Sequence, residues 1–207
     1  ENLCVKAYQL LHSDFNLSPV KIHLHKVIPA GAGLGGGSSD AVFTLRCLNS
    51  LFNLNLSNEQ MNGYAARLGS DCTFFVTDTA KLGHGRGERL SPIAVSLKGL
   101  YLVIVKPPIH ISTAEAFAGI KPKEPLQSIS QGIELPITSW KEKLTNDFEE
   151  SVFKTHPKIH ELKQELYHQG ALYASMSGSG SAVFGIFNGP VHLKNNFEGD
   201  YWAGVLS

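Results

Sequence analysis

The chain has 207 residues, which is enough for one large domain or two small ones, and we expect two. Its 18 Lys and Arg side chains balance its 18 Asp and Glu side chains, so no long-range field would gather polyanions and no nucleic-acid partner is expected. Three scattered cysteines without a C-x-x-C pair argue against a disulfide framework or a zinc site and favour a reducing cytoplasm. No apolar run approaches the roughly 20 residues that span a bilayer, so no membrane association is expected.

The first half of the chain predicts helix, strand, loop and two further helices. Residues 3–11 carry apolar side chains at helical spacing, whereas VKIHLHKVI, residues 20–28, alternates as a strand that Pro29 ends. A glycine-rich loop then opens a helix whose buried stripe runs from Ala41 to Phe52. In the next helix, Ser57 and Gln60 form a predicted capping box, and Gly69 marks the C-terminal end.

The second half mixes turns, strands and one clear helix. Glycines 83, 85 and 87 indicate strand edges and turns, and GLYLVIVKPP, residues 99–108, predicts an apolar strand. Prolines and polar residues over 121–136 predict an irregular connection, and helical spacing resumes over 156–170. Because helices and strands do not alternate regularly, the fold class is α+β, with domains over 1–92 and 93–207.

The segment PAGAGLGGGSSDA, residues 29–41, predicts a phosphate-binding loop. Glycine lets backbone N–H groups approach a bulky oxyanion, and the N-terminus of the following helix adds unpaired donors and a favourable dipole. Gly31, Gly33 and Gly36 satisfy the dinucleotide-binding pattern G-x-G-x-x-G, which is weak by itself. That fold also needs a ribose-binding acid at the end of a second strand about 20 residues further on, and the acid there, Glu59, lies in a helix-capping turn, so the dinucleotide reading is not supported. A Walker loop is excluded because no lysine lies between Ile28 and Thr44.

The proline, the glycine run and the paired serines of this loop resemble the phosphate loop of the GHMP small-molecule kinases. Three glycines before Ser-Ser-Asp-Ala most resemble the branch that phosphorylates 4-diphosphocytidyl-2-C-methyl-D-erythritol in bacterial isoprenoid synthesis. ARLGSDCTFF resembles the segment with the family's catalytic aspartate, GHGRGERLSPI the segment after it, and ASMSGSGSAVFGIF the third glycine motif. The resemblance therefore spans nearly the whole chain.

This resemblance implies a two-domain GHMP kinase fold with its active site in the inter-domain cleft. Residues 1–92 would be the remainder of the N-terminal ATP-binding domain, and residues 93–207 the C-terminal substrate-side domain. The implied activity is ATP-dependent phosphorylation of the 2-hydroxyl of that methylerythritol compound, with ATP and Mg²⁺ as cofactors. The implied partner is a small-molecule substrate, and the implied protein is a cytoplasmic monomer or homodimer.

The resemblance also implies site residues. Asp71 would be catalytic, accepting the alcohol's proton, although without the resemblance a helix-capping role would be preferred. The implied ATP-binding residues are Asn2, Lys26, Pro29, Gly31, Gly33, Leu34, Gly35, Gly36, Gly37, Ser38 and Ser39. The implied substrate-binding residues are Thr113, Phe117, Gly178 and Ser179. The metal ligands stay open, because the serine hydroxyls could reach phosphate or magnesium and Asp40 fits the helix dipole.

The family opens with a strand carrying a Pro-x-Lys-x-Asn-like motif, and none precedes Glu1, so we expect an N-terminally incomplete kinase with impaired catalysis. Two alternatives stay open. The chemistry could act on another alcohol, such as homoserine, mevalonate, phosphomevalonate or a sugar. The chain could also be a nucleotide-binding module without catalysis.

Overall fold

The computed structural model describes residues 2–85, 87–120, 128–191, 193 and 197–207. The chain forms two compact units: the first comprises residues 1–30 and 35–93, and the second comprises 31–34 and 94–207. The short segment 31–34, from the middle of the glycine-rich loop, thus packs with the second unit. The assignment of ATP binding to residues 1–92 and substrate binding to 93–207 stays a prediction.

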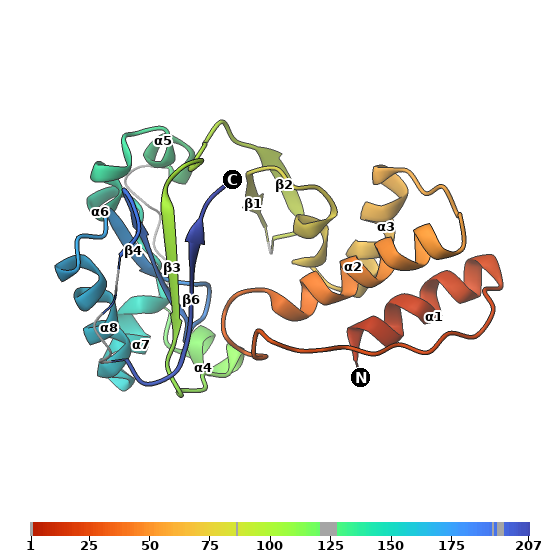
Figure 1. The fold of residues 1–207 in the computed structure, drawn as a ribbon, viewed down its shortest axis with the longest axis horizontal. Helices are drawn as coiled ribbons and strands as arrows, with labels where there is room; N and C mark the ends of the chain where they lie inside the picture. Colours follow the sequence, from red (N-terminus) through yellow and green to blue (C-terminus); the bar gives the residue numbers. More distant parts are fainter. Residues whose placement is uncertain (1, 86, 121–127, 192, 194–196) are drawn as a thin grey trace. The chain divides into compact units, whose positions relative to one another are not determined.

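The first unit is a cluster of helices with a hairpin (Figure 1). Its elements are α1 (Leu3–Phe15), α2 (Gly36–Leu51), α3 (Asn58–Leu68), a 3-10 helix (Cys72–Val76) and the antiparallel pair β1 (Lys81–His84) and β2 (Arg89–Pro92). The apolar stripes of the helices meet in one core, made by Ala7, Leu11, Leu17, Ala41, Val42, Leu45, Leu48, Met61, Ala65, Cys72 and Val76. This burial of one face per helix is what the helical spacing predicts.

Local capping signals set the ends of these helices. The side chain of Asn2 accepts a hydrogen bond from the backbone N–H of Cys4 at the start of α1. The predicted capping box at Ser57 and Gln60 is confirmed, because each side chain bonds the other residue's backbone N–H, and Gly69 caps the C-terminus of α3. Such caps stabilise a helix by satisfying first-turn donors that have no intrahelical partner.

The predicted strand over residues 20–28 is wrong, since the structure assigns that segment neither strand nor helix. Alternating side chains only make a strand when its backbone joins a ladder with another strand. Among the described residues, no strand pairs with 20–28. The pattern therefore predicted a strand where the structure has an irregular segment.

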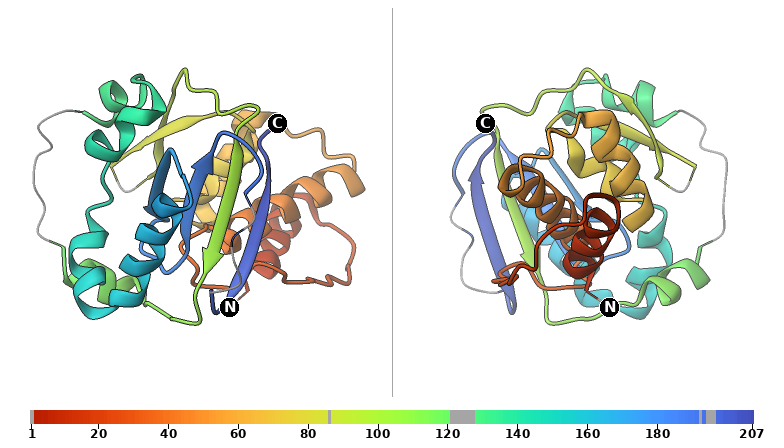
Figure 2. Two further views of the ribbon diagram at one scale, coloured as in Figure 1. Left: turned by 60° about the vertical axis from the view of Figure 1, so that its left-hand side comes forward. Right: turned by 90° about the vertical axis from the view of Figure 1, so that its right-hand side faces the viewer.

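The second unit is built on a four-stranded antiparallel sheet, whose strands lie side by side in Figure 2. The spatial order is β4 (Tyr173–Met176), β5 (Val183–Phe187), β3 (Tyr101–Lys106) and β6 (Asp200–Val205). Its helices are α4 (Thr113–Ala118), α5 (Ile129–Ile133), α6 (Trp140–Lys143), α7 (Phe148–Thr155) and α8 (Pro157–His168), with a 3-10 turn at Ile137–Ser139. The expected strand in 99–108 and the helix in 156–170 are thus confirmed.

The two faces of this sheet carry separate apolar clusters. Alternate residues of β3, such as Val103 and Val105, pack with the buried side of α8, including Ile159 and Leu166. The opposite face packs Tyr173 and its neighbours against Trp140 of α6. The period of two along a strand thus separates the two clusters.

Residues 121–136 were expected to be irregular. Residues 121–127 lie outside the described part, but α5 follows, with Ser128 as its N-cap, so the expectation is wrong there. Within the described residues, no helix combines the length and apolar character needed to cross a membrane.

Candidate functional site

The first turn of α2 presents backbone donors. Its N-cap residue Gly35 has φ +66° and, as a glycine, has no side chain to cap the helix, so the amides of residues 36–38 are left without a side-chain cap; the amide of Ser39 bonds the Gly35 carbonyl. A Cβ at Gly35 would lie 2.9 Å from the ring of Phe75, which makes glycine the residue that fits there. The predicted phosphate loop therefore opens a helix in the manner expected of an anion site.

Lys26 brings a positive charge to the same helix end. Its ammonium pairs with the carboxylate of Asp40 and lies 3.1 Å from the position of a Cβ on Gly36. The sequence predicted Lys26 as a nucleotide contact and left Asp40 without a clear role. In the structure, Asp40 is the residue that holds Lys26 at the N-terminal end of α2.

Asp71 stands at the N-terminal end of the 3-10 helix Cys72–Val76. Its side chain makes no capping bond to that helix, although the hydroxyl of Ser70 donates to its Oδ1 across 3.4 Å. The helix-capping role that the sequence suggested as an alternative for Asp71 is therefore not observed. The carboxylate is exposed and remains available for chemistry.

The buried Cys72, which directly follows Asp71, belongs to the same apolar core as Ala41 and Leu45 of α2. Burial raises the pKa of the Cys72 thiol, and Ser38 has an opposing effect on it. The segment that carries Asp71 therefore packs against α2 within the first unit.

The middle of the glycine loop is held by the loop between β4 and β5 in the second unit. The hydroxyl of Ser177 donates to the carbonyl of Gly33 across 2.9 Å, and Ala182 N–H donates to the carbonyl of Ala32 across 3.0 Å. Gly33 has φ +76°, and a Cβ on it would lie 2.1 Å from the carbonyl oxygen of Ser177. Here only glycine allows the two backbones to approach this closely.

The predicted substrate-binding residues lie at two places in the second unit. Gly178 packs against Gly33, with a Cβ position 3.0 Å from the Gly33 carbonyl, and Ser179 is the next, partly buried residue. Thr113 and Phe117 belong to the short helix α4. Phe117 is 62% exposed, and its ring meets that of Phe148 edge to face, with 5.0 Å between centroids. It is therefore not the core residue that its spacing alone would favour.

Of three further residues predicted to bind the nucleotide, one caps a helix and two have apolar side chains. Asn2 caps α1, which is the alternative considered for it from sequence. Pro29 and Leu34 are partly buried at the two ends of the loop and supply no polar side chain. No cluster of three or more His, Cys, Asp or Glu side chains that could hold a metal ion by itself occurs in the described part of the chain.

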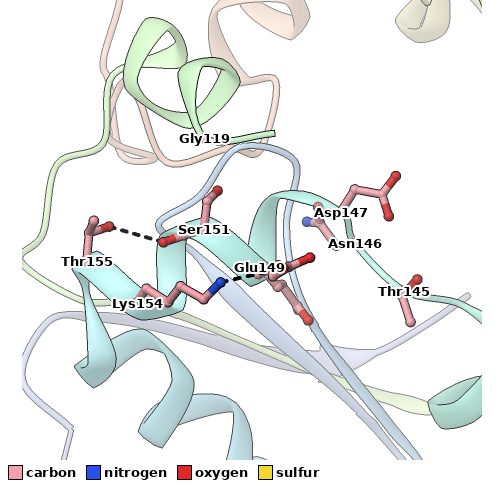
Figure 3. Close-up of a pocket in the computed structure, with 9 residues that line it drawn as sticks. Gly119, Thr145, Asn146, Asp147, Glu149, Ser151, Lys154 and Thr155 are labelled. Atoms are coloured by element: carbon pink, nitrogen blue, oxygen red, sulfur yellow. Dashed lines mark hydrogen bonds and ion pairs between the residues drawn. The ribbon is translucent and has the colours of Figure 1, made fainter. Parts of the chain in front are cut away.

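Sequence reasoning missed a pocket that runs from Thr145 along α7 to Thr155, with a volume of about 520 Å³ and a lining of mostly polar side chains (Figure 3). Its lining includes Asn146, whose side-chain amide donates to the carbonyls of Met176 and Gly178, each across 2.8 Å. It also includes Glu149, which is only 8% exposed. The signal available in the sequence was an acid on the apolar stripe of a helix, three residues before the buried Val152.

Two family models match the chain: GHMP kinases N terminal domain over residues 2–78 and GHMP kinases C terminal over residues 134–195. The chain belongs to the GHMP kinases, a family of small-molecule kinases. The resemblance seen in its glycine motifs and the α+β fold class are thereby confirmed.

Curated relatives and solved structures agree with this membership. A 4-diphosphocytidyl-2-C-methyl-D-erythritol kinase of Bacteroides thetaiotaomicron is 57% identical over 90% of this chain and 68% of its own length. A kinase of the same description from Cytophaga hutchinsonii is 50% identical over 90% of this chain and 70% of its own length. A crystal structure of 4-(cytidine 5'-diphospho)-2C-methyl-D-erythritol kinase matches with a TM-score of 0.79 and 30% identity, covering 99% of this chain and 77% of that one.

A homoserine kinase of Cytophaga hutchinsonii has a similar TM-score, 0.80, but only 16% identity, covering 99% of this chain and 76% of that one. At 16% identity, this similarity supports the fold alone.

Proposed function

We propose that the protein containing this chain transfers the γ-phosphoryl group of ATP to the 2-hydroxyl of 4-diphosphocytidyl-2-C-methyl-D-erythritol, a step of isoprenoid precursor synthesis. The observation that carries this proposal is the 57% identity to a kinase described for that substrate, extending over 90% of the chain. The four glycine-containing segments that indicated this branch of the family follow one another in this chain in the order of the family's motifs.

The residues at the start of α2 suit a triphosphate. Uncapped amides, the helix dipole and the ammonium of Lys26 all favour negative charge at one place. Magnesium would be held by the phosphates themselves and by the hydroxyls of Ser38 and Ser39, where it would neutralise charge on the transferred group. We assign Gly35, Gly36 and Gly37 to the same phosphate contact.

Asp71 is the proposed general base. Phosphoryl transfer has a loose, charge-spread transition state, so a protein mainly positions the reactants and neutralises charge. The alcohol oxygen attacks the γ-phosphorus, its proton passes to the carboxylate of Asp71, and the bond from phosphorus to the β,γ-bridging oxygen breaks to release ADP. The exposed carboxylate of Asp71, not engaged in capping its own helix, supports this role.

Other parts of the assignment follow from family membership. We propose that residues 1–92 contribute chiefly to ATP binding and 93–207 to substrate binding. Thr113 and Phe117 would line the cytidine side, where an exposed aromatic ring can stack on a base, and Gly178 and Ser179 would contact the acceptor. A monomer or homodimer in the cytoplasm is the proposed working form.

A coupled assay for ADP release by the full-length protein tests the proposal. With ATP, magnesium and the cytidyl-methylerythritol substrate, steady turnover is expected, and Asp71→Asn should reduce kcat by about a hundredfold or more. Turnover with homoserine, mevalonate, phosphomevalonate or a sugar, but not with the proposed substrate, would show that the kinase acts on a different alcohol. ATP binding without turnover on any of them would favour a non-catalytic nucleotide-binding module.

A further inference from the structure

We propose that Asn146, with Glu149, is a positioning residue for the phosphate loop: through the loop between β4 and β5, these side chains at the start of α7 hold Gly33 in its left-handed turn. The proposal deepens the proposed kinase function and rests on it for its catalytic consequence. It assigns a task to a polar cluster that lies outside the glycine motifs.

The first link is the amide of Asn146. Its Nδ2 donates to two carbonyls, those of Met176 and Gly178, each across 2.8 Å, while its Oδ1 accepts from the N–H of Phe148 across 3.0 Å. Both the nitrogen and the oxygen of this amide thus form hydrogen bonds, and these bonds join the β4–β5 loop to the first turn of α7. An aspartate of the same shape could keep the Phe148 contact but would direct a charged oxygen at two carbonyls.

The second link is the carboxylate of Glu149, which fastens the last two residues of β4, directly before the same loop. Its Oε1 accepts from Met176 N–H across 2.8 Å and from the Ser175 hydroxyl across 3.2 Å. Its Oε2 meets the ammonium of Lys163 on α8 at 2.5 Å. A buried carboxylate is costly unless it is paired and hydrogen-bonded, and here both conditions hold. Figure 3 shows Glu149 and Asn146 side by side on the wall of the pocket.

The third link runs from the β4–β5 loop to the phosphate loop. Ser177, which lies between the two carbonyls held by Asn146, donates its hydroxyl to the Gly33 carbonyl across 2.9 Å. The backbones are so close that a Cβ on Gly33 would lie 2.1 Å from the Ser177 carbonyl oxygen. A shift of the β4–β5 loop must therefore move Gly33 or break this contact.

The consequence is preorganisation of the loop. Gly33 lies two residues before the N-cap of α2, so its conformation sets how the chain enters the uncapped turn that would receive phosphate. Positioning errors of about an ångström can cost two orders of magnitude in rate when reactants must be aligned. Asn146 and Glu149 contact neither nucleotide nor alcohol in this proposal; they act through the two loops.

The experiment uses the full-length protein and four variants: Asn146→Asp, Ser177→Ala, Ser177→Thr and, as the matched control, Thr155→Ala. Thr155 lies exposed at the far end of α7, where it also lines the pocket, and within the described residues its hydroxyl bonds only carbonyls of its own helix. Amide hydrogen exchange is measured without nucleotide on peptides covering 31–37 and, for comparison, peptides of α8 and β3. Steady-state assays give KM for ATP, KM for the alcohol and kcat.

We expect Asn146→Asp to speed exchange in 31–37 by about tenfold while exchange in α8 and β3 stays near the wild-type rate. The KM for ATP should rise by about tenfold, whereas the KM for the alcohol should change by less than about twofold. Ser177→Ala should act in the same direction, and Ser177→Thr, which keeps the hydroxyl, should restore most of the wild-type behaviour. Thr155→Ala should match the wild type.

Equal acceleration of exchange throughout the second unit would overturn the positioning role, because a purely structural residue has that effect. If Asn146→Asp fails to fold, Ser177→Ala decides: a folded variant with wild-type exchange in 31–37 refutes the proposal. The exchange measurement needs no reaction. A wild-type protein with the expected exchange pattern but no turnover would therefore contradict the proposed function alone.

Discussion

The ammonium of Lys26 pairs with the carboxylate of Asp40 in the second turn of α2, although the two residues are 14 positions apart in sequence. The same ammonium lies 3.1 Å from the Cβ position of Gly36, at the positive end of the helix dipole. A cation is unfavourable at that end unless an anion is also present. Asp40 supplies one such anion, and the phosphates of ATP would supply the stronger one.

Replacing Lys26 by Met should therefore weaken nucleotide binding more than folding. Loss of one charge-assisted contact to phosphate predicts a rise of about tenfold in KM for ATP, with a smaller change in the KM for the alcohol. Steady-state kinetics with each substrate varied in turn measures both. Lys21→Met is the control, because Lys21 is an exposed lysine of the same irregular segment. An equal change in both variants would mean that general charge, not this contact, matters.

Gly33→Ala tests the close approach of the two loops. Its φ of +76° is unfavourable for alanine, and the added Cβ would lie 2.1 Å from the carbonyl oxygen of Ser177. We expect kcat/KM for ATP to fall by about a hundredfold because the loop must shift. Gly63→Ala is the control: it lies within α3 with nothing within 4 Å of its Cβ position. That variant should be more stable by roughly 0.5–1 kcal/mol and fully active. Near-normal activity of Gly33→Ala would contradict the left-handed turn.

Arg46 fastens the 3-10 helix that begins after Asp71. Its Nη2 donates to the carbonyls of Phe75 and Val76 across 3.2 and 2.7 Å. Arg46→Met keeps much of the apolar stem but loses both bonds, so we expect a loss of about 2 kcal/mol in unfolding free energy and a reduced kcat. Urea unfolding and the coupled assay measure the two effects.

Arg67→Met is the matched control for that prediction. Arg67 is an arginine of the same unit whose side chain is 53% exposed and lies 3.6 Å from Asp14. Exposed ion pairs contribute less than about 1 kcal/mol, so this variant should stay close to wild type in both measurements. Equal losses in the two variants would show that the contacts of Arg46 to the 3-10 helix have no special effect.

Tyr173 gives the second unit a dependence on alkaline pH. Burial raises the pKa of its phenol to about 12, with a further contribution from the charge of Glu149 and an opposing hydrogen bond with Ser175. A group whose pKa is raised on folding stabilises the folded state below its unfolded value, here 10, and loses that contribution as pH rises toward 12. Unfolding free energy should therefore decline over this range.

Tyr173→Phe isolates this effect. Below pH 10 the variant should be about 1 kcal/mol less stable, because the phenol donates to the Leu144 carbonyl across 3.1 Å. Between pH 10 and 12 the difference should shrink, since only the wild type loses stability by ionising this phenol. Urea midpoints at several pH values check the prediction. A constant difference across that range would mean that Tyr173 does not titrate as described.

Much of the fold could be predicted from local patterns. The stripe through Ala7 and Leu11 predicted α1, and the capping box at Ser57 and Gln60 predicted the start of α3. These signals work because helix caps and apolar spacing act over a few residues. The strand predicted over 20–28 failed for the opposite reason, since pairing depends on a partner far along the chain.

The candidate site likewise contains residues that the sequence could identify and residues that it could not. The glycine loop and Asp71 could be singled out because their residue types are unusual and carry their own chemistry. Asn146 and Glu149 could not, because an asparagine before a helix and an acid within one have many ordinary uses. Only their contacts with Met176 distinguish them.

Sequence alone determined the presence of α1, α2, α3 and α8, which faces they bury, and where glycine frees the backbone for a phosphate loop, since all of these follow from interactions between neighbours along the chain. Tertiary structure decided what that freedom is used for. Gly33 and Ser177 are 144 residues apart, and their hydrogen bond exists only because the folded sheet brings the β4–β5 loop to the glycine turn. Contacts across such separations depend on the whole path of the chain and leave no local pattern from which to predict them.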